Sequence, residues 1–137
     1  MVVKEIWPKA ASPVVPADIP EPSKRAFLQA ERNYLQRGNE DAAAIMYRKS
    51  LEAALKTKYP QATGPLAKRI DDLVKDNVVP AEIGSWAHEI RIVGNDGAHD
   101  VDGITRELEA MRGFTDAVLR YLFTLPAQVA ARQVAKP

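Results

Sequence analysis

Apolar side chains recur every three or four residues through most of this sequence, with prolines and glycines between the runs. This spacing is typical of amphipathic helices, because positions three and four apart share one helix face. It predicts helices from Glu21 to Gly38, from Glu40 to Lys58, from Leu66 to about Asp76, from Pro80 to at least Arg91, and from about Asp102 to just before Pro126. No run alternates with period two for long enough to predict a strand. The expected fold class is therefore all-α, an up-and-down helical bundle of four to five helices.

Each predicted helix has one apolar stripe that is expected to face the core. The stripes comprise Ala26, Phe27, Ala30, Tyr34 and Leu35; Ala43, Met46, Tyr47, Ser50, Leu51, Ala54 and Leu55; Leu66, Ile70, Leu73 and Val74; Ile83, Trp86, Ala87 and Ile90; and Ile104, Leu108, Met111, Thr115, Val118 and Leu122. The second helix is rich in alanine, whose small side chain permits close approach of a neighbour. That helix is therefore predicted at the centre of the bundle.

The two ends of the chain are expected to differ from the bundle. Half of the ten prolines lie in the first 22 residues, and each removes an amide donor and disfavours helix in the residue before it. Residues 1–20 are therefore predicted to be an extended Pro-rich lead-in that lies along the bundle with Trp7 as an anchor; a free tail is the alternative. Residues 21–125 would form the bundle, and residues 126–137 a tail that is one further helical turn or disordered.

Composition excludes several classes of chemistry. The 137 residues suit one domain, and the absence of cysteine excludes disulfides, thiolate zinc sites and a cysteine nucleophile. Nineteen basic and eighteen acidic residues give a net charge of +1, so no overall field draws the protein to nucleic acid. No apolar run reaches the ~20 residues of a membrane span, and the N-terminus lacks the apolar block of a signal peptide. A cytoplasmic protein without membrane partners is expected.

The segment 89–100 concentrates polar side chains between two predicted helices. Arg91, Asn95 and His99 follow one another at intervals of four, so they share a face if the helix continues through Gly94. If Gly94 instead ends the helix as a left-handed cap, the three side chains can still converge. A guanidinium and a carboxamide can hold a phosphate, and an imidazole can transfer a proton near neutral pH. The alternative is that the three only fix the corner between two helices.

Two further sets of residues bear on this corner. Arg48 and Glu52 are spaced for a surface ion pair within one helix, but Arg48 also has apolar neighbours and could instead turn toward His99 as a second cation. Metal ligands could be sought in His88, Asp96, His99 and Asp100, yet no His-x-x-x-His spacing is present. No metal and no cofactor are therefore expected.

Two motifs carry a family resemblance. The string Arg91-Ile-Val-Gly94-Asn95-Asp-Gly-Ala98-His99, preceded by the helix segment Tyr47-Arg48-Lys49-Ser50-Leu51-Glu52, resembles the HEPN superfamily of helical bundles. It is most similar to an uncharacterised branch with the pattern Arg-x-x-Gly-Asn-x-x-Ala-His, which is often fused to restriction enzymes and other phage-defence proteins. The resemblance spans roughly residues 18–125. It implies a four- or five-helix bundle that often forms homodimers, with the polar motifs of the two protomers facing one another.

The resemblance also implies roles for individual residues. In ribonuclease members an Arg, a polar residue and a His form the catalytic motif, which would make His99 the catalytic histidine and Asn95 the polar residue. This chain departs from that pattern, because Gly94 occupies the position of the Arg. Arg91 would then have to supply the cation.

Two functions follow as expectations. The first is an interaction or regulatory module, associated with defence, that binds a partner protein or a phosphate-bearing ligand such as RNA or a nucleotide at Arg48, Arg91, Asn95 and His99. The alternative is a metal-independent endoribonuclease that uses Arg91, Asn95 and His99 as catalytic residues in a composite site across a homodimer. The near-neutral net charge favours the first, because avid RNA binding normally needs a basic surface.

Overall fold

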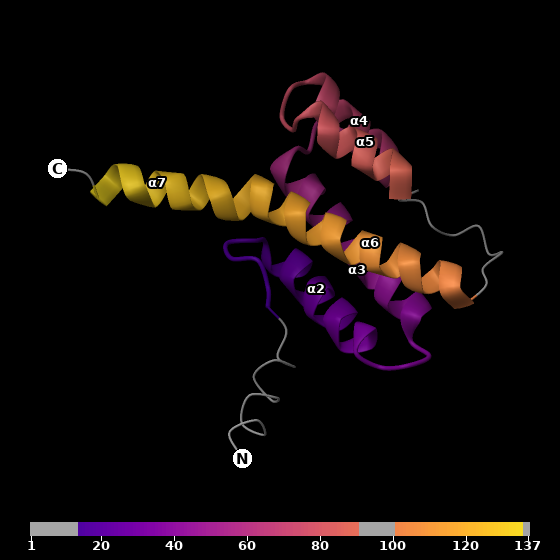
Figure 1. The fold of residues 1–137 in the computed structure, drawn as a ribbon. Helices are drawn as coiled ribbons and strands as arrows, with labels where there is room; N and C mark the ends of the chain where they lie inside the picture. The colour runs from indigo at the N-terminus through magenta and orange to yellow at the C-terminus, as the bar shows by residue number, and fades with distance from the viewer. Residues whose placement is uncertain (1–13, 91–100, 136–137) are drawn as a thin grey trace, which may run out of the picture.

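The computed structural model describes residues 14–90 and 101–135. In them the chain forms helices α2 (Glu21–Tyr34), α3 (Glu40–Lys58), α4 (Leu66–Lys75), α5 (Ala81–Ile90), α6 (Val101–Leu119) and α7 (Leu125–Ala135), with a five-residue π-helix, η1 (Arg120–Thr124), between α6 and α7. These residues contain no strand, so the predicted all-α bundle is confirmed (Figure 1). None of the described helices is long and apolar enough to cross a lipid bilayer.

In the first helical hairpin, the predicted bounds of α3 are confirmed, whereas α2 ends earlier than predicted. α3 spans the predicted residues Glu40–Lys58. α2 ends at Tyr34, before the predicted stop at Gly38, because residues 35–39 already form the turn into α3. Gly38 has a left-handed φ of +89° in this turn, a conformation that favours glycine. Leu35 therefore lies outside the helix and is exposed, and its predicted place in the core stripe is wrong.

α3 lies at the centre of the bundle, as its alanine content predicts. It packs against α2, α4 and α6. Small residues let α2 and α3 approach closely: the hydroxyls of Ser23 and Ser50 each donate a 2.8 Å hydrogen bond to the carbonyl oxygen of the other residue. The core comprises Phe27, Ala30, Ala43, Tyr47, Leu51, Ala54, Leu55, Leu66, Ile70, Leu73, Val79, Ala87, Leu108, Met111, Phe114, Val118, Leu119 and Leu122. Most of the predicted stripe residues are thus confirmed as core.

The described part of the lead-in, residues 14–20, contacts the bundle and turns at residues 17–18. Pro16 is buried. The hydroxyl of Thr124 donates a 2.6 Å hydrogen bond to the carbonyl oxygen of Ala17, which ties the lead-in to the end of η1. Trp7, the predicted anchor, lies outside the described residues.

The prediction that the last helix stops before Pro126 is wrong. α6, η1 and α7 follow one another without a break, and α7 continues to Ala135 as an 11-residue helix rather than a short or disordered tail. Proline normally ends a helix because its ring clashes with the carbonyl four residues earlier and because it has no amide donor. Here Pro126 follows a π-helix, in which the amide of Leu125 bonds to the carbonyl of Arg120, and this wider turn changes the register before the proline. α7 therefore projects beyond the bundle (Figure 1).

Candidate functional site

The predicted corner lies in the connection between α5 and α6. α5 ends at Ile90 and α6 begins at Val101, so Arg91, Asn95 and His99 all fall outside the described residues. Ile90 packs against the core, which holds the first end of this connection on the bundle. Convergence of the three polar side chains stays a prediction.

Arg48 lies on α3, where its Nε is 3.4 Å from Oε2 of Glu52. The two side chains are 27% and 32% exposed, so the pair lies at the edge of the core rather than fully in solvent. The predicted ion pair within one helix is confirmed. The alternative orientation toward His99 stays a prediction, because His99 is outside the described part of the chain.

An ionic cluster with a buried carboxylate lies at the seam where α2, α3 and α6 meet. Glu31 of α2 is 3% exposed. Arg112 of α6 binds its carboxylate through two hydrogen bonds, from Nε to Oε2 over 2.8 Å and from Nη2 to Oε1 over 3.0 Å. The hydroxyl of Tyr47, which is fully buried on α3, donates a further hydrogen bond to Oε2. These three residues, named here the seam cluster, join three helices through one carboxylate.

The pKa values of the three seam-cluster side chains are all shifted away from neutral pH. Burial alone would raise the pKa of Glu31, but hydrogen bonds from Arg112 and Tyr47 and the charge of Arg112 outweigh it, so this pKa lies below its usual value of 4.5. Burial and the hydrogen bond to Glu31 raise the pKa of Tyr47. The hydrogen bond to Glu31 also raises the pKa of Arg112. At pH 7 the cluster is therefore a carboxylate held by a guanidinium and a neutral phenol.

A cavity of about 330 Å³ opens beside the seam cluster. This seam pocket is lined by Val14, Phe27, Glu31, Tyr34, Glu109, Arg112, Gly113, Asp116 and Arg120. The hydroxyl of Tyr34 donates a 3.0 Å hydrogen bond to Glu109, and the Arg112 guanidinium lies 4.2 Å from the centre of the Tyr34 ring. Burial and the hydrogen bond to Glu109 raise the pKa of Tyr34. Farther along α6, Nε of Arg120 lies 2.8 Å from Oδ2 of Asp116.

The seam pocket is better suited to binding a ligand than to general acid–base catalysis. A general acid or base works best when its pKa lies near the operating pH, and the shifts at Glu31, Tyr34 and Tyr47 all lead away from neutrality. Each of the three lining carboxylates accepts a hydrogen bond from a neighbouring side chain. Guanidinium N–H groups remain for a ligand, since the side chains of Arg112 and Arg120 are both 42% exposed.

The seam cluster is expected to make stability depend on acid pH. The pKa of Glu31 is lower in the folded chain than its usual 4.5, so its contribution is fully present above pH 4.5 and is lost as the pH falls through the folded-state value. The difference in Tm between the wild type and Glu31→Gln should therefore shrink on acidification below pH 4.5. Thermal unfolding followed by circular dichroism measures it, and a difference that stays constant with pH would contradict the assignment.

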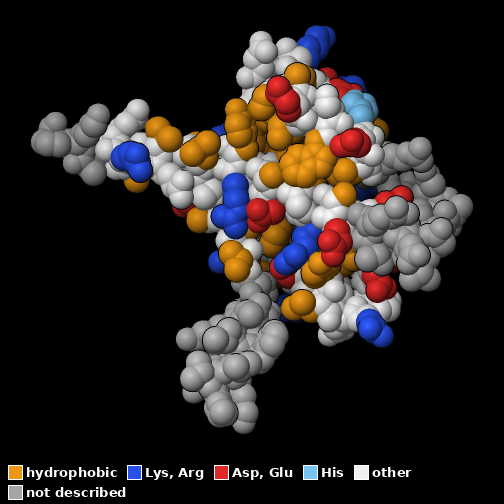
Figure 2. All heavy atoms as spheres, viewed as in Figure 1, with side chains coloured by type: hydrophobic (Ala, Val, Ile, Leu, Met, Phe, Trp, Pro, Cys, Tyr) orange, Lys and Arg blue, Asp and Glu red, His pale blue; other side chains and the backbone are white. Residues whose placement is uncertain are grey.

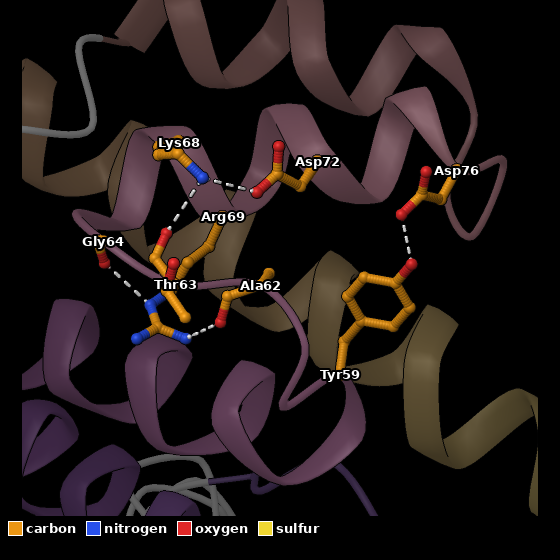
Figure 3. A network of polar contacts seen from close by, with 8 residues as sticks. All are labelled: Tyr59, Ala62, Thr63, Gly64, Lys68, Arg69, Asp72 and Asp76. Atoms are coloured by element: carbon orange, nitrogen blue, oxygen red, sulfur yellow. Dashed lines mark hydrogen bonds and ion pairs between the residues drawn. The ribbon is translucent and has the colours of Figure 1, made fainter.

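A second polar cluster fixes the connection between α3 and α4 (Figure 3). The guanidinium of Arg69 points into this loop, where Nε donates to the carbonyl of Gly64 over 2.8 Å and Nη1 to that of Ala62 over 2.7 Å. Lys68 binds a further loop carbonyl and the carboxylate of Asp72. These donors satisfy backbone carbonyls that would otherwise lack a partner. The cluster therefore holds the loop in place.

Among the described residues, no group of three or more His, Asp and Glu side chains is placed to hold a metal ion. His88 of α5 lies 3.0 Å from Oδ1 of Asp71 on α4, and both side chains are more than half exposed. This pair links α4 to α5 at the surface.

Sequence reasoning missed the seam cluster. Glu31 follows Phe27 by four residues and so shares the apolar face of α2, while Arg112 adjoins Met111 in the stripe of α6. The charged Glu31 within an apolar stripe is the signal that could have indicated an ion pair, because Glu is almost never fully buried unless paired. The pairing itself is hidden, since 81 positions separate the two residues.

Comparison with known families gives a match over most of the chain. The family described as Domain of unknown function (DUF4145) matches residues 29–135, a span that includes the seam cluster and the predicted corner. Neither the curated proteins nor the solved structures contain a significant match.

Proposed function

We propose the following function for this chain, which belongs to the DUF4145 family over residues 29–135: it is an interaction or regulatory module that binds a partner protein or a phosphate-bearing ligand. The observation that supports the proposal is the mutual pairing in the seam pocket. Its carboxylates all accept hydrogen bonds from neighbouring side chains, and its shifted pKa values lie away from neutrality. Such a network stabilises a rigid scaffold at the seam of α2, α3 and α6.

The proposed ligand site is the corner formed by Arg91, Asn95 and His99. It is supported by the attachment of the flanking helices, since α5 packs on α4 and α6, and α6 packs on α3. A guanidinium recognises a phosphate through a planar fork of donors, a carboxamide adds one more, and a protonated imidazole adds charge. Arg48 belongs to the proposal as a second cation. A homodimer and a partner protein from a defence system belong to it through the resemblance to HEPN-like domains.

Phosphate binding by the full chain is the test of this site. Isothermal titration calorimetry with inorganic phosphate at a fixed pH is expected to show saturable binding. Arg91→Ala should weaken binding on the order of tenfold, the loss expected from removing a charge-assisted hydrogen bond. Arg25→Ala, an exposed arginine on α2, is the matched control and should bind as the wild type does. Absence of binding, or equal weakening in both variants, would contradict the site.

A further variant, His99→Ala, separates binding from catalysis. Incubation of the full chain with RNA in EDTA is expected to leave the RNA intact. RNA cleavage that persists in EDTA and disappears in His99→Ala would instead establish the competing function, a metal-independent endoribonuclease with Arg91, Asn95 and His99 as its catalytic residues. Cleavage that EDTA abolishes would contradict both functions.

A further inference from the structure

α7 has an apolar face that no described residue covers. Leu125 and Val129 are four residues apart and so lie on the same side of α7. They are 49% and 47% exposed. α7 touches the rest of the chain chiefly through η1. Its apolar face is thus a packing surface without a partner inside the described chain.

α7 carries one charged side chain, that of Arg132, and no aspartate or glutamate. Arg132 lies beside Leu125 and Val129, and these residues together with Gln128 and Gln133 line a shallow groove of about 290 Å³. An apolar helix face flanked by an arginine fits an apolar surface with an acidic rim.

Such a surface lies on α5. Glu82, Trp86 and Glu89 are spaced to share one helix face, and with Ser85 and His88 they line a shallow hollow of about 520 Å³. The Trp86 ring packs edge-on against the Phe114 ring, with 5.2 Å between the ring centroids, and it is only partly buried. Both glutamates are exposed, and α5 contains no lysine or arginine. Figure 2 shows the corresponding apolar patch with acidic side chains and the histidine beside it.

We propose that α7 of one chain docks on the α5 face of a second copy of this chain. The two surfaces are complementary in polarity and in charge, with Arg132 able to meet the glutamates while Leu125 and Val129 cover Trp86. Their lengths also agree, since 11 and 10 helical residues at 1.5 Å rise span about 16 and 15 Å. Pairing of α7 with another α7 is disfavoured, because both helices would bring arginine and neither would bring a carboxylate.

This contact is head-to-tail, because it joins two different surfaces. Each added chain leaves one α7 and one α5 face open, so association continues beyond the dimer unless the geometry closes a ring. α7 extends on one side of the bundle and α5 lies on another (Figure 1). Leu125 and Val129 on α7 and both glutamates on α5 are exposed. Ligand binding at the corner is not needed for this association.

Two blocked variants of the full chain test the proposal by sedimentation velocity. Leu125→Glu/Val129→Glu blocks the α7 face, and Glu82→Lys/Glu89→Lys reverses the charge of the α5 face. The wild type is expected to form species larger than the 15.1 kDa monomer as concentration rises, including species beyond the dimer. Each blocked variant alone should associate on the order of tenfold more weakly or not at all. An equimolar mixture of the two should restore association and stop at the dimer.

Two control variants test whether weaker association depends on the α7 and α5 faces rather than on any change of charge. Val134→Glu adds a charge to α7 nine residues after Leu125, which places it on the opposite side of the helix, and Glu21→Lys/Asp41→Lys repeats the charge change away from α5. Both should associate as the wild type does. All substituted side chains are exposed, and far-ultraviolet circular dichroism verifies the fold. A wild type that stays monomeric, a blocked variant that associates normally, or a mixture that stays monomeric while the wild type associates would each overturn the proposal.

Discussion

Replacement of Arg112 by methionine is expected to lower the free energy of unfolding by about 3 kcal/mol, because it leaves the carboxylate of Glu31 buried without its cation. Glu31 is 3% exposed, and Arg112 supplies two of its hydrogen bonds. Methionine keeps an apolar stem near the Tyr34 ring, whereas the ion pair with Glu31 and the cation–π contact with Tyr34 are both lost. Equilibrium unfolding in urea measures it.

A double-mutant cycle isolates the pair. Glu31→Gln removes the charge but keeps an acceptor for the hydroxyl of Tyr47. Once the carboxylate is gone, Arg112→Met no longer leaves a buried charge unpaired, so the double variant should lose clearly less stability than the sum of the single losses. Additive losses would show that the two side chains do not interact in solution.

Truncation of Phe114 to alanine is expected to lower the free energy of unfolding by about 4 kcal/mol. Phe114 is fully buried on α6 and packs edge-on against Trp86 of α5, so its removal leaves a cavity and loosens α5. Tyr121→Ala, on the adjoining η1 and 41% exposed, is the control and should cost about 0.5 kcal/mol. Similar losses in the two variants would contradict the assignment of Phe114 to the core between α5 and α6.

The architecture could be predicted from the sequence because helix periodicity is a local signal. Ala43, Leu51 and Ala54 lie where the stripe of α3 places them, fully buried at the centre of the bundle. The end of the last helix could not be predicted from the local rule that Pro126 stops a helix. That rule assumes a regular α-helix before the proline, and η1 is wider.

The seam pocket could not be predicted because it depends on pairs distant in the sequence. Glu31 pairs with Arg112 and Tyr34 with Glu109, separated by 81 and 75 positions. Local patterns state which face a side chain shares within its helix, and they do not state which helix lies opposite. The corner at Arg91, Asn95 and His99 differs from the seam pocket in this respect. Its spacing is local and visible in the sequence, while its geometry lies outside the described residues.

We propose that this member of the DUF4145 family binds a phosphate-bearing ligand at the corner between α5 and α6, with the seam cluster as scaffold. A titration of the isotope-labelled full chain with inorganic phosphate, followed by nuclear magnetic resonance of backbone amides, tests this proposal. Saturable shifts are expected at Arg91, Asn95 and His99, with little change at Glu31 and Arg112. Shifts confined to the seam pocket, or none that saturate, would contradict it.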